Sequence, residues 1–115
     1  MPRVALTLTA TAAPNAPAGV PLVLSASDAS SFNSFPSRGN DLVIAQNTDS
    51  VTRHVTIHSV ADHIGRTGDL TSVAITAGQV LIFGPFPVNA WAQSDGNINV
   101  DTDNALVKLA VVHLP

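Results

Sequence analysis

Apolar and polar residues alternate with a period of two over several short stretches of this chain. Thr52–Val60 places Val55 and Ile57 on one face of a strand and polar side chains on the other. Asn97–Thr102 alternates in the same way. Asp41–Gln46 instead carries a continuous apolar run, which predicts a central strand covered on both faces. The pattern therefore indicates strands and shows no helical period.

Turn residues separate these stretches and predict about eight short strands. Ala77-Gly78, Asp95-Gly96 and Asp103-Asn104 are turn signals, because glycine and asparagine accept the backbone angles of tight turns. No strand–helix–strand rhythm is present, so antiparallel sheets are expected. The fold class that follows is all-β: a two-sheet antiparallel β-sandwich, jelly-roll-like or immunoglobulin-like. The expected strands are about Arg3–Thr9, Leu22–Ser25, Asp41–Gln46, Thr52–Val60, Thr71–Thr76, Gln79–Phe83, Asn97–Thr102 and Ala105–Leu114, with Val88–Gln93 as a short edge segment.

One domain is expected, because 115 residues suffice for a single core. Residues 1–21 are predicted to be an N-terminal strand followed by a Pro-rich arm, and residues 22–115 the sandwich. Pro14, Pro17 and Pro21 exclude a helix interior in the arm. We expect this segment to be a loop or an extended arm that adds a strand to a neighbour's sheet edge.

The Ser-rich stretch Ala26–Asn40 shows no clean period and is expected to be a long loop. It carries Phe32 and Phe35 among polar residues. Two aromatic rings in a polar loop indicate docking. The rings pack either on the loop's own domain, which is the more common case, or on a partner.

A second aromatic segment follows the strand that ends near Phe83. Gly84-Pro85-Phe86-Pro87 must end the hydrogen-bonded ladder, because proline has no backbone N–H to donate. We expect the chain to leave one sheet here and turn a corner into the next. Phe86 and Trp91 are predicted to pack at that corner.

Charged residues make up only 11% of the chain, and the net charge is −3. The five basic residues are scattered singly, so no basic stripe exists for nucleic acid. Low charge is typical of an assembly subunit, whose interfaces are poor in Lys, Glu and Asp, although a Ser/Thr/Asn-rich surface has the same composition. Cysteine is absent, which excludes disulfides, thiol catalysis and Cys-type zinc sites. No signal-peptide pattern and no apolar stretch of membrane-spanning length is present, so synthesis in the cytoplasm is expected.

Candidate chemistry in the sequence is weak. His54 and His58 share a strand face but lie about 13 Å apart, too far to bind one metal ion. Asp95, Asp101 and Asp103 stand among asparagines in an oxygen-rich cluster that calcium favours, but the EF-hand spacing is missing. The chain has no nucleophile elbow and no Gly-rich phosphate loop. We therefore expect no enzymatic activity, no cofactor and no metal.

The order of elements from Asp41 to Leu114 carries a resemblance. An apolar strand, an Ala-Gly turn, a second apolar strand and Gly-Pro-Phe-Pro are followed by an aromatic, Asp-Gly, an alternating strand and a final apolar strand. This order resembles the small head decoration, or cement, proteins of tailed bacteriophages. The resemblance implies a structural protein that binds the outside of an assembled shell and strengthens it, with the major capsid protein as partner. It also implies a homo-oligomer, a trimer or a dimer, on the capsid surface of the virion.

The first forty residues carry no such resemblance, and their role in docking is a hypothesis. The candidate partner-binding residues come from the arm and the Phe-containing loop: Arg3, Val4, Leu6, Pro14, Pro17, Phe32 and Phe35. An alternative function is a carbohydrate- or receptor-binding sandwich of a phage tail or fibre, for which Trp91 is the available aromatic. A subunit that builds the shell itself is a third alternative.

Overall fold

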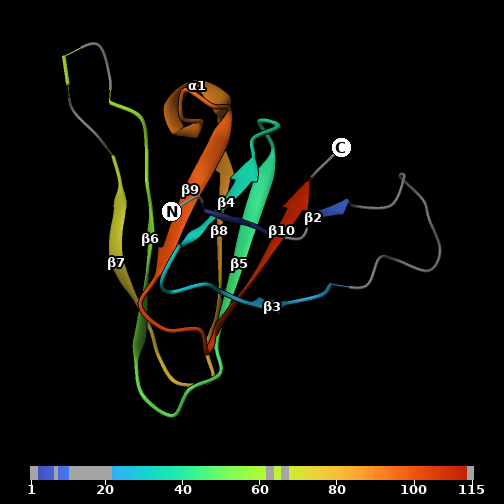
Figure 1. Cartoon of the computed structure of the whole chain (residues 1–115), viewed down its shortest axis with the longest axis vertical. Helices are drawn as coiled ribbons and strands as arrows, with labels where there is room; N and C mark the ends of the chain where they lie inside the picture. The colour runs from blue at the N-terminus through green and yellow to red at the C-terminus, as the bar shows by residue number, and fades with distance from the viewer. Residues whose placement is uncertain (1–2, 7, 11–21, 62–63, 66–67, 114–115) are drawn as a thin grey trace.

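Two β-sheets lie face to face in the computed structural model, with one short helix at an end of the sandwich (Figure 1). The structure describes residues 3–6, 8–10, 22–61, 64–65 and 68–113. Within these residues the strands are β1 Val4–Ala5, β2 Leu8–Ala10, β3 Ser25–Ala26, β4 Asn33–Pro36, β5 Asp41–Asn47, β6 Arg53–Ile57, β7 Leu70–Ile75, β8 Val80–Phe86, β9 Asn97–Thr102 and β10 Val107–His113, and the helix is α1 Val88–Trp91.

The eight strands β3–β10 are wound as a jelly roll. The first sheet has the order β1-β4-β9-β6-β7, and the second has the order β2-β10-β5-β8, with β3 also paired to β10. The antiparallel pairs β3–β10, β4–β9, β5–β8 and β6–β7 are nested, as in one long hairpin. Pairing of β5 with β10 and of β6 with β9 closes this hairpin into two sheets. The predicted antiparallel sandwich of jelly-roll type is confirmed.

β5 and β10 are the central strands of the second sheet. They pair over seven residues, from Asp41 opposite His113 to Asn47 opposite Val107. Their continuous apolar runs supply side chains to both faces, as the sequence predicts for central strands. The core between the sheets consists of Leu6, Phe35, Val43, Ala45, Val55, Ile57, Ile75, Phe86, Ile98, Val100, Val107, Leu109 and Val111.

The N-terminal strand crosses from one sheet to the other. Val4–Ala5 pairs in parallel with β4, and Leu8–Ala10 pairs in parallel with β10. Leu6 lies between the two short strands and is buried in the core. Val4–Ala5 and Leu8–Ala10 therefore pair within this chain's own sheets and are not a free arm. The Pro-rich part of the predicted arm, 11–21, lies outside the described residues.

The expectation that 26–40 contains no strand is wrong. Asn33–Pro36 forms β4, which lies between β1 and β9 in the first sheet. Three of its four residues are buried, and Phe35 is fully enclosed in the core. Serine and proline at its positions concealed the strand pattern, because tertiary burial here overrides local propensity.

The expectation that Gly84-Pro85-Phe86-Pro87 ends the ladder is wrong, because β8 continues through Gly84 and Pro85 to Phe86, which pairs with Asp41 beyond a register shift. The chain turns the corner between the sheets only after Phe86. Gly84 has φ 118° and a Cβ there would lie 2.6 Å from the carbonyl oxygen of Asp41, so only glycine fits. Pro87 precedes the helix, and the chain then enters β9 in the other sheet. A short helix therefore stands where Val88–Gln93 was expected as an edge strand. The rings of Phe86 and Trp91 meet edge to face at 4.8 Å between centroids.

The side chain of Asn47 connects the β5–β6 turn to strand β7 by hydrogen bonds. It is fully buried, and its Nδ2 donates to the carbonyl oxygens of Val51 and Ile75, each at 2.8 Å. Its Oδ1 accepts the backbone N–H of Asp49 at 2.9 Å. One side chain thus satisfies three backbone groups from the β5–β6 turn and β7.

We expect Asn47→Ala to lower the free energy of unfolding by about 3 kcal/mol, because it leaves these backbone groups without a partner. Urea denaturation followed by circular dichroism measures the change. Gln46→Ala is the matched control, since Gln46 lies on the outer face of the same strand and is only half-buried. Equal losses for the two variants would contradict this role for Asn47.

Candidate functional site

The outer faces of the two sheets differ in chemistry. Strands β6 and β9 of the first sheet bury Val55, Ile57, Ile98 and Val100, so their alternate side chains point outward. Those outward side chains are polar: His54 and Thr56 on β6 with His58 directly after it, and Asn97, Asn99 and Asp101 on β9. The outward side chains of the second sheet are largely apolar: Leu42, Ile44, Val80, Ile82, Ala110 and Val112.

The apolar face of the second sheet, defined by these six residues, reaches solvent mainly at strand β8. Ile82, Ile44 and Ala110 form one row across three strands. Ala110 and Ile44 are buried, whereas Ile82 is 65% exposed and Val80 is 48% exposed. β8 ends the sheet and has no charged residue from Val80 to Phe86. The exposed end of this face is therefore an uncharged edge strand.

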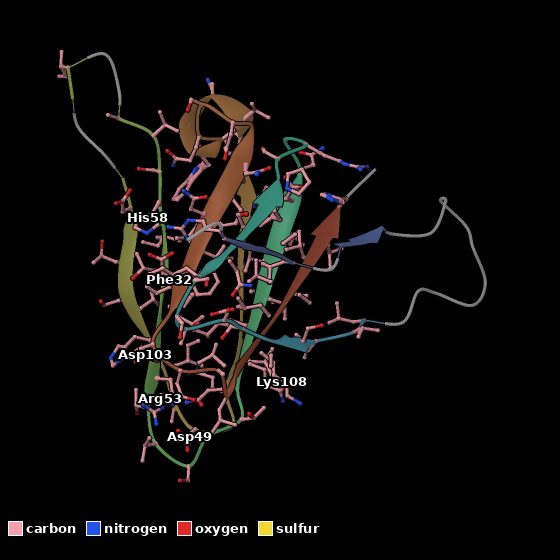
Figure 2. The ribbon with its side chains drawn as sticks, viewed as in Figure 1. Phe32, Asp49, Arg53, His58, Asp103 and Lys108 are labelled. Carbon is pink, nitrogen blue, oxygen red and sulfur yellow. The ribbon has the colours of Figure 1, made fainter. Side chains whose placement is uncertain are left out.

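The polar face of the first sheet carries close contacts between histidines and aspartates. His58 Nε2 lies 2.7 Å from Asp101 Oδ2, and its Nδ1 lies 3.6 Å from Asp69. Arg3 binds the other oxygen of Asp101 and also donates to the carbonyl oxygen of Asn33 at 3.1 Å. Figure 2 shows Phe32, His58 and Asp103 over this sheet, with Lys108 apart from them on the second. The network ties β1, β6 and β9 together on one surface.

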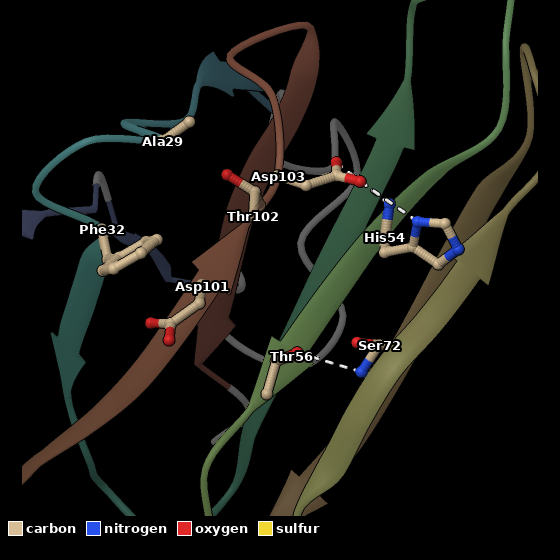
Figure 3. Close-up of a pocket in the computed structure, with 8 residues that line it drawn as sticks. All are labelled: Ala29, Phe32, His54, Thr56, Ser72, Asp101, Thr102 and Asp103. Atoms are coloured by element: carbon tan, nitrogen blue, oxygen red, sulfur yellow. Dashed lines mark hydrogen bonds and ion pairs between the residues drawn. The ribbon is translucent and has the colours of Figure 1, made fainter.

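A hollow of about 360 Å³ opens on this polar face (Figure 3). Strands β6, β7 and β9 form its floor, and the segment before β4 forms one wall. Its lining residues are Ala29, Phe32, His54, Thr56, Ser72, Asp101, Thr102 and Asp103.

Three contacts fix the polar groups of the hollow. His54 Nδ1 lies 3.1 Å from Asp103 Oδ2, and the His54 backbone N–H donates to Asp103 Oδ1 at 3.1 Å. Thr56 Oγ1 accepts the backbone N–H of Ser72 at 3.0 Å, where β7 bulges away from β6. Among the described residues, Phe32 and Ser72 are the non-glycine residues with positive φ, at 64° and 47°. Both line the hollow.

The predicted partner-binding residues do not form one surface. Val4 is exposed, and Arg3 lies half-buried with its guanidinium 5.6 Å from the centre of the Phe32 ring. Leu6 and Phe35 are in the core and are not available to a partner. Pro14 and Pro17 lie outside the described residues.

The corner residues Gly84, Pro85, Phe86, Pro87 and Trp91 have a packing role. Phe86 is buried, and Trp91 packs against it and against the core. Trp91 is therefore no exposed platform for a sugar, which removes the residue on which the carbohydrate alternative depended. Phe32 is also half-buried, and it lines the hollow.

Sequence reasoning placed the histidines and aspartates on outward strand faces but missed their pairing. The pairing requires β6 to lie beside β9, and Thr56 is opposite Asp101 in that register. No group of three metal-ligating side chains occurs in the described part of the chain. In the oxygen-rich stretch, Asp95 and Asn104 each accept a nearby backbone N–H and shape turns.

Two aspartates have a pKa below the ordinary value of 3.8. The pKa of Asp69 is lowered chiefly by the backbone N–H of Ser59, against the opposing effect of burial, with further help from the Ser59 hydroxyl and His58. The pKa of Asp49 is lowered chiefly by the side chain of Arg53, and also by the backbone of Ser50. Asp69 thereby fixes the start of the loop that joins β6 to β7.

No protein-family model matches this chain, and comparisons with curated proteins and with solved structures also give no match. Among the described residues, no helix is long and apolar enough to cross a membrane.

The lowered pKa of Asp69 predicts an acid-dependent loss of stability. Because the pKa is lower in the folded state, the contribution is present above pH 3.8 and is lost as pH falls through the folded pKa. We expect Asp69→Asn to cost about 1 kcal/mol of unfolding free energy at pH 7 and less at pH 3. Thermal unfolding between pH 7 and pH 3 measures this, with exposed Thr71→Ala as control. A cost for Asp69→Asn that does not change with pH would contradict the assignment.

Proposed function

We propose that this chain is a non-enzymatic structural protein that binds the outside of an assembled bacteriophage shell and stabilises it, as a decoration or cement protein. The observation that supports an assembling protein is the apolar face of the second sheet, which ends in an uncharged, exposed edge strand. We assign the β8 edge to a second copy of the chain, so that the shell is bound by the dimer. Val80 and Ile82 expose apolar side chains on this strand, and an uncharged edge strand is a site where another chain can pair. The major capsid protein is the proposed partner, and the virion surface is the proposed location.

The edge of β8 is suited to pairing with another strand. The backbone N–H of Asn47 donates to Gln79 at 3.1 Å, and the register then runs without a shift to Val43 opposite Phe83. Along an antiparallel ladder, hydrogen-bonded residue pairs alternate with pairs that are not hydrogen-bonded to each other. Val80 and Ile82 belong to the second kind of pair, so their backbone N–H and C=O groups point away from β5. Protected edges usually carry charges, and this one carries none. We take a second copy of the chain as the occupant, with β8 against β8 about a two-fold axis.

The resemblance and the fold add support by analogy. Jelly rolls occur in viral capsid proteins and in lectins, so the fold is compatible with the proposed function and with its carbohydrate-binding alternative. The low charge of the chain agrees with a subunit whose surfaces become interfaces.

A decoration protein stabilises a shell because it binds only the assembled state. At free concentrations far above the dissociation constant, this gives a few kcal/mol per site, repeated over the shell. The Pro-rich arm from 11 to 21 is the proposed second contact, since Val4–Ala5 and Leu8–Ala10 already pair within the chain's own sheets.

We expect Ile82→Lys to weaken self-association by more than about tenfold, because a lysine replaces an apolar side chain that is buried on pairing. Sedimentation velocity over a concentration series measures the effect. Ala74→Lys is the matched control, since Ala74 is also exposed on an edge strand but belongs to the first sheet. A monomeric parent, or equal losses for both variants, would contradict pairing through β8.

The number of copies per major capsid subunit in purified particles tests the main proposal. Quantitative mass spectrometry is expected to give a ratio near one, or a simple fraction set by capsid symmetry. A handful of copies per particle would instead indicate a tail or fibre module, and absence from particles would overturn the proposal.

A further inference from the structure

We infer that the hollow on the polar face of the first sheet binds a neutral pyranose ring of a glycan. This goes beyond shell binding, which uses the other sheet. The inference depends on the size of the hollow, the residues with unusual backbone angles, and the hydrogen-bonding groups that line it.

The hollow has the size and lining of a small-ligand site. About 360 Å³ lies at the lower end of the range for pockets that hold small molecules, and it accommodates a single sugar ring. Phe32 gives it an apolar wall, and the apolar faces of pyranoses pack on aromatic rings. The Arg3 guanidinium lies 5.6 Å from the centre of the Phe32 ring and holds it in place.

Backbone strain is concentrated at this site. Among the described residues, the two non-glycine positive φ angles belong to Phe32 and Ser72. These residues come from segments forty positions apart in sequence, and both line the hollow. A positive φ is costly for a bulky residue such as Phe32, and strained residues of this kind cluster at active sites and ligand sites.

The polar groups offer both acceptors and donors, as sugar hydroxyls require. Asp103 is 40% exposed, and its oxygens have acceptor capacity beyond their bonds to His54. Thr56 Oγ1 accepts from the Ser72 backbone and keeps its own hydrogen to donate. The Ser72 hydroxyl can also donate or accept a hydrogen bond.

The charges of the hollow disfavour an anionic ligand and, at Asp101, a cationic one. Two carboxylates line it, whereas Arg3 and His58 both bind Asp101 from beside it. An anionic ligand would meet Asp103 with no lysine or arginine in the lining to balance it. A cationic side chain from a peptide would compete with Arg3, which already occupies Asp101.

The test is a titration of the full chain followed by amide NMR shifts. The probes are methyl α-mannopyranoside, methyl α-glucopyranoside, methyl β-galactopyranoside and N-acetylglucosamine. At least one is expected to give saturable shifts at His54, Thr56, Ser72 and 101–103. Sorbitol, an open-chain polyol, and N-acetylneuraminic acid, an anionic sugar, are expected to give none. Absence of saturable shifts for all four pyranosides, or shifts confined to other surfaces, overturns the inference.

Matched variants locate the binding. Asp103→Asn keeps the shape but removes the carboxylate, and it is expected to weaken binding at least about tenfold. Phe32→Asn is expected to do the same, because asparagine accepts the positive φ but has no ring. Asn99→Ser lies on the same face outside the hollow and is expected to bind as the parent does. Parent-like affinity in Asp103→Asn overturns the inference even if Phe32→Asn fails to fold. Ile82→Lys lies on the other sheet and is expected to retain sugar binding. A failure of the shell proposal can therefore be told apart from a failure of the sugar-binding inference.

Discussion

The pairing of β5 with β10 is the constraint on which the rest of the structure depends. Seven residue pairs join segments at least sixty positions apart, and the buried pair Asp41–His113 lies at one end of the register. This ladder converts a nested set of hairpins into a closed roll. It also fixes β8 on one side and β2 and β3 on the other. The N-terminal strand can then bridge the two sheets, with Leu6 sealed between them.

The two sheets share one core but present opposite chemistry to solvent. Alternation on β6 and β9 gives the first sheet a polar face, on which aspartates hold histidines and Arg3. Continuous apolar runs in β5, β8 and β10 give the second sheet an apolar face that is only partly covered. The first surface suits a small polar ligand, and the second suits another protein. One small domain can therefore carry two interactions without competition between them.

The candidate site shows where sequence reasoning ends. Strand alternation placed His54, His58 and Asp101 on outward faces, because side chains on a strand point to opposite sides in turn. Strand alternation could not predict that β6 lies beside β9, because the two strands are far apart in the sequence. For the same reason, the sequence could not predict that Phe32 and Ser72 line the same hollow, because their segments come together only in the folded sheet. The predicted packing of Trp91 against Phe86 is confirmed. The use of Trp91 as a sugar-binding aromatic was suggested by residue type alone, and this packing does not favour it.

The all-β class, the central position of β5, the turns and the change of sheet between Phe86 and Trp91 could be predicted from the sequence alone. These features follow from local rules: period-two alternation, continuous apolar runs, and the backbone limits of glycine and proline. Only the tertiary structure decided the strand order, the assignment of Asn33–Pro36 to a strand, and the place of Val4–Ala5 and Leu8–Ala10 within the chain's own sheets. The reason is physical. Which strands become neighbours depends on burying apolar faces from distant segments together, and local pattern does not record the partner.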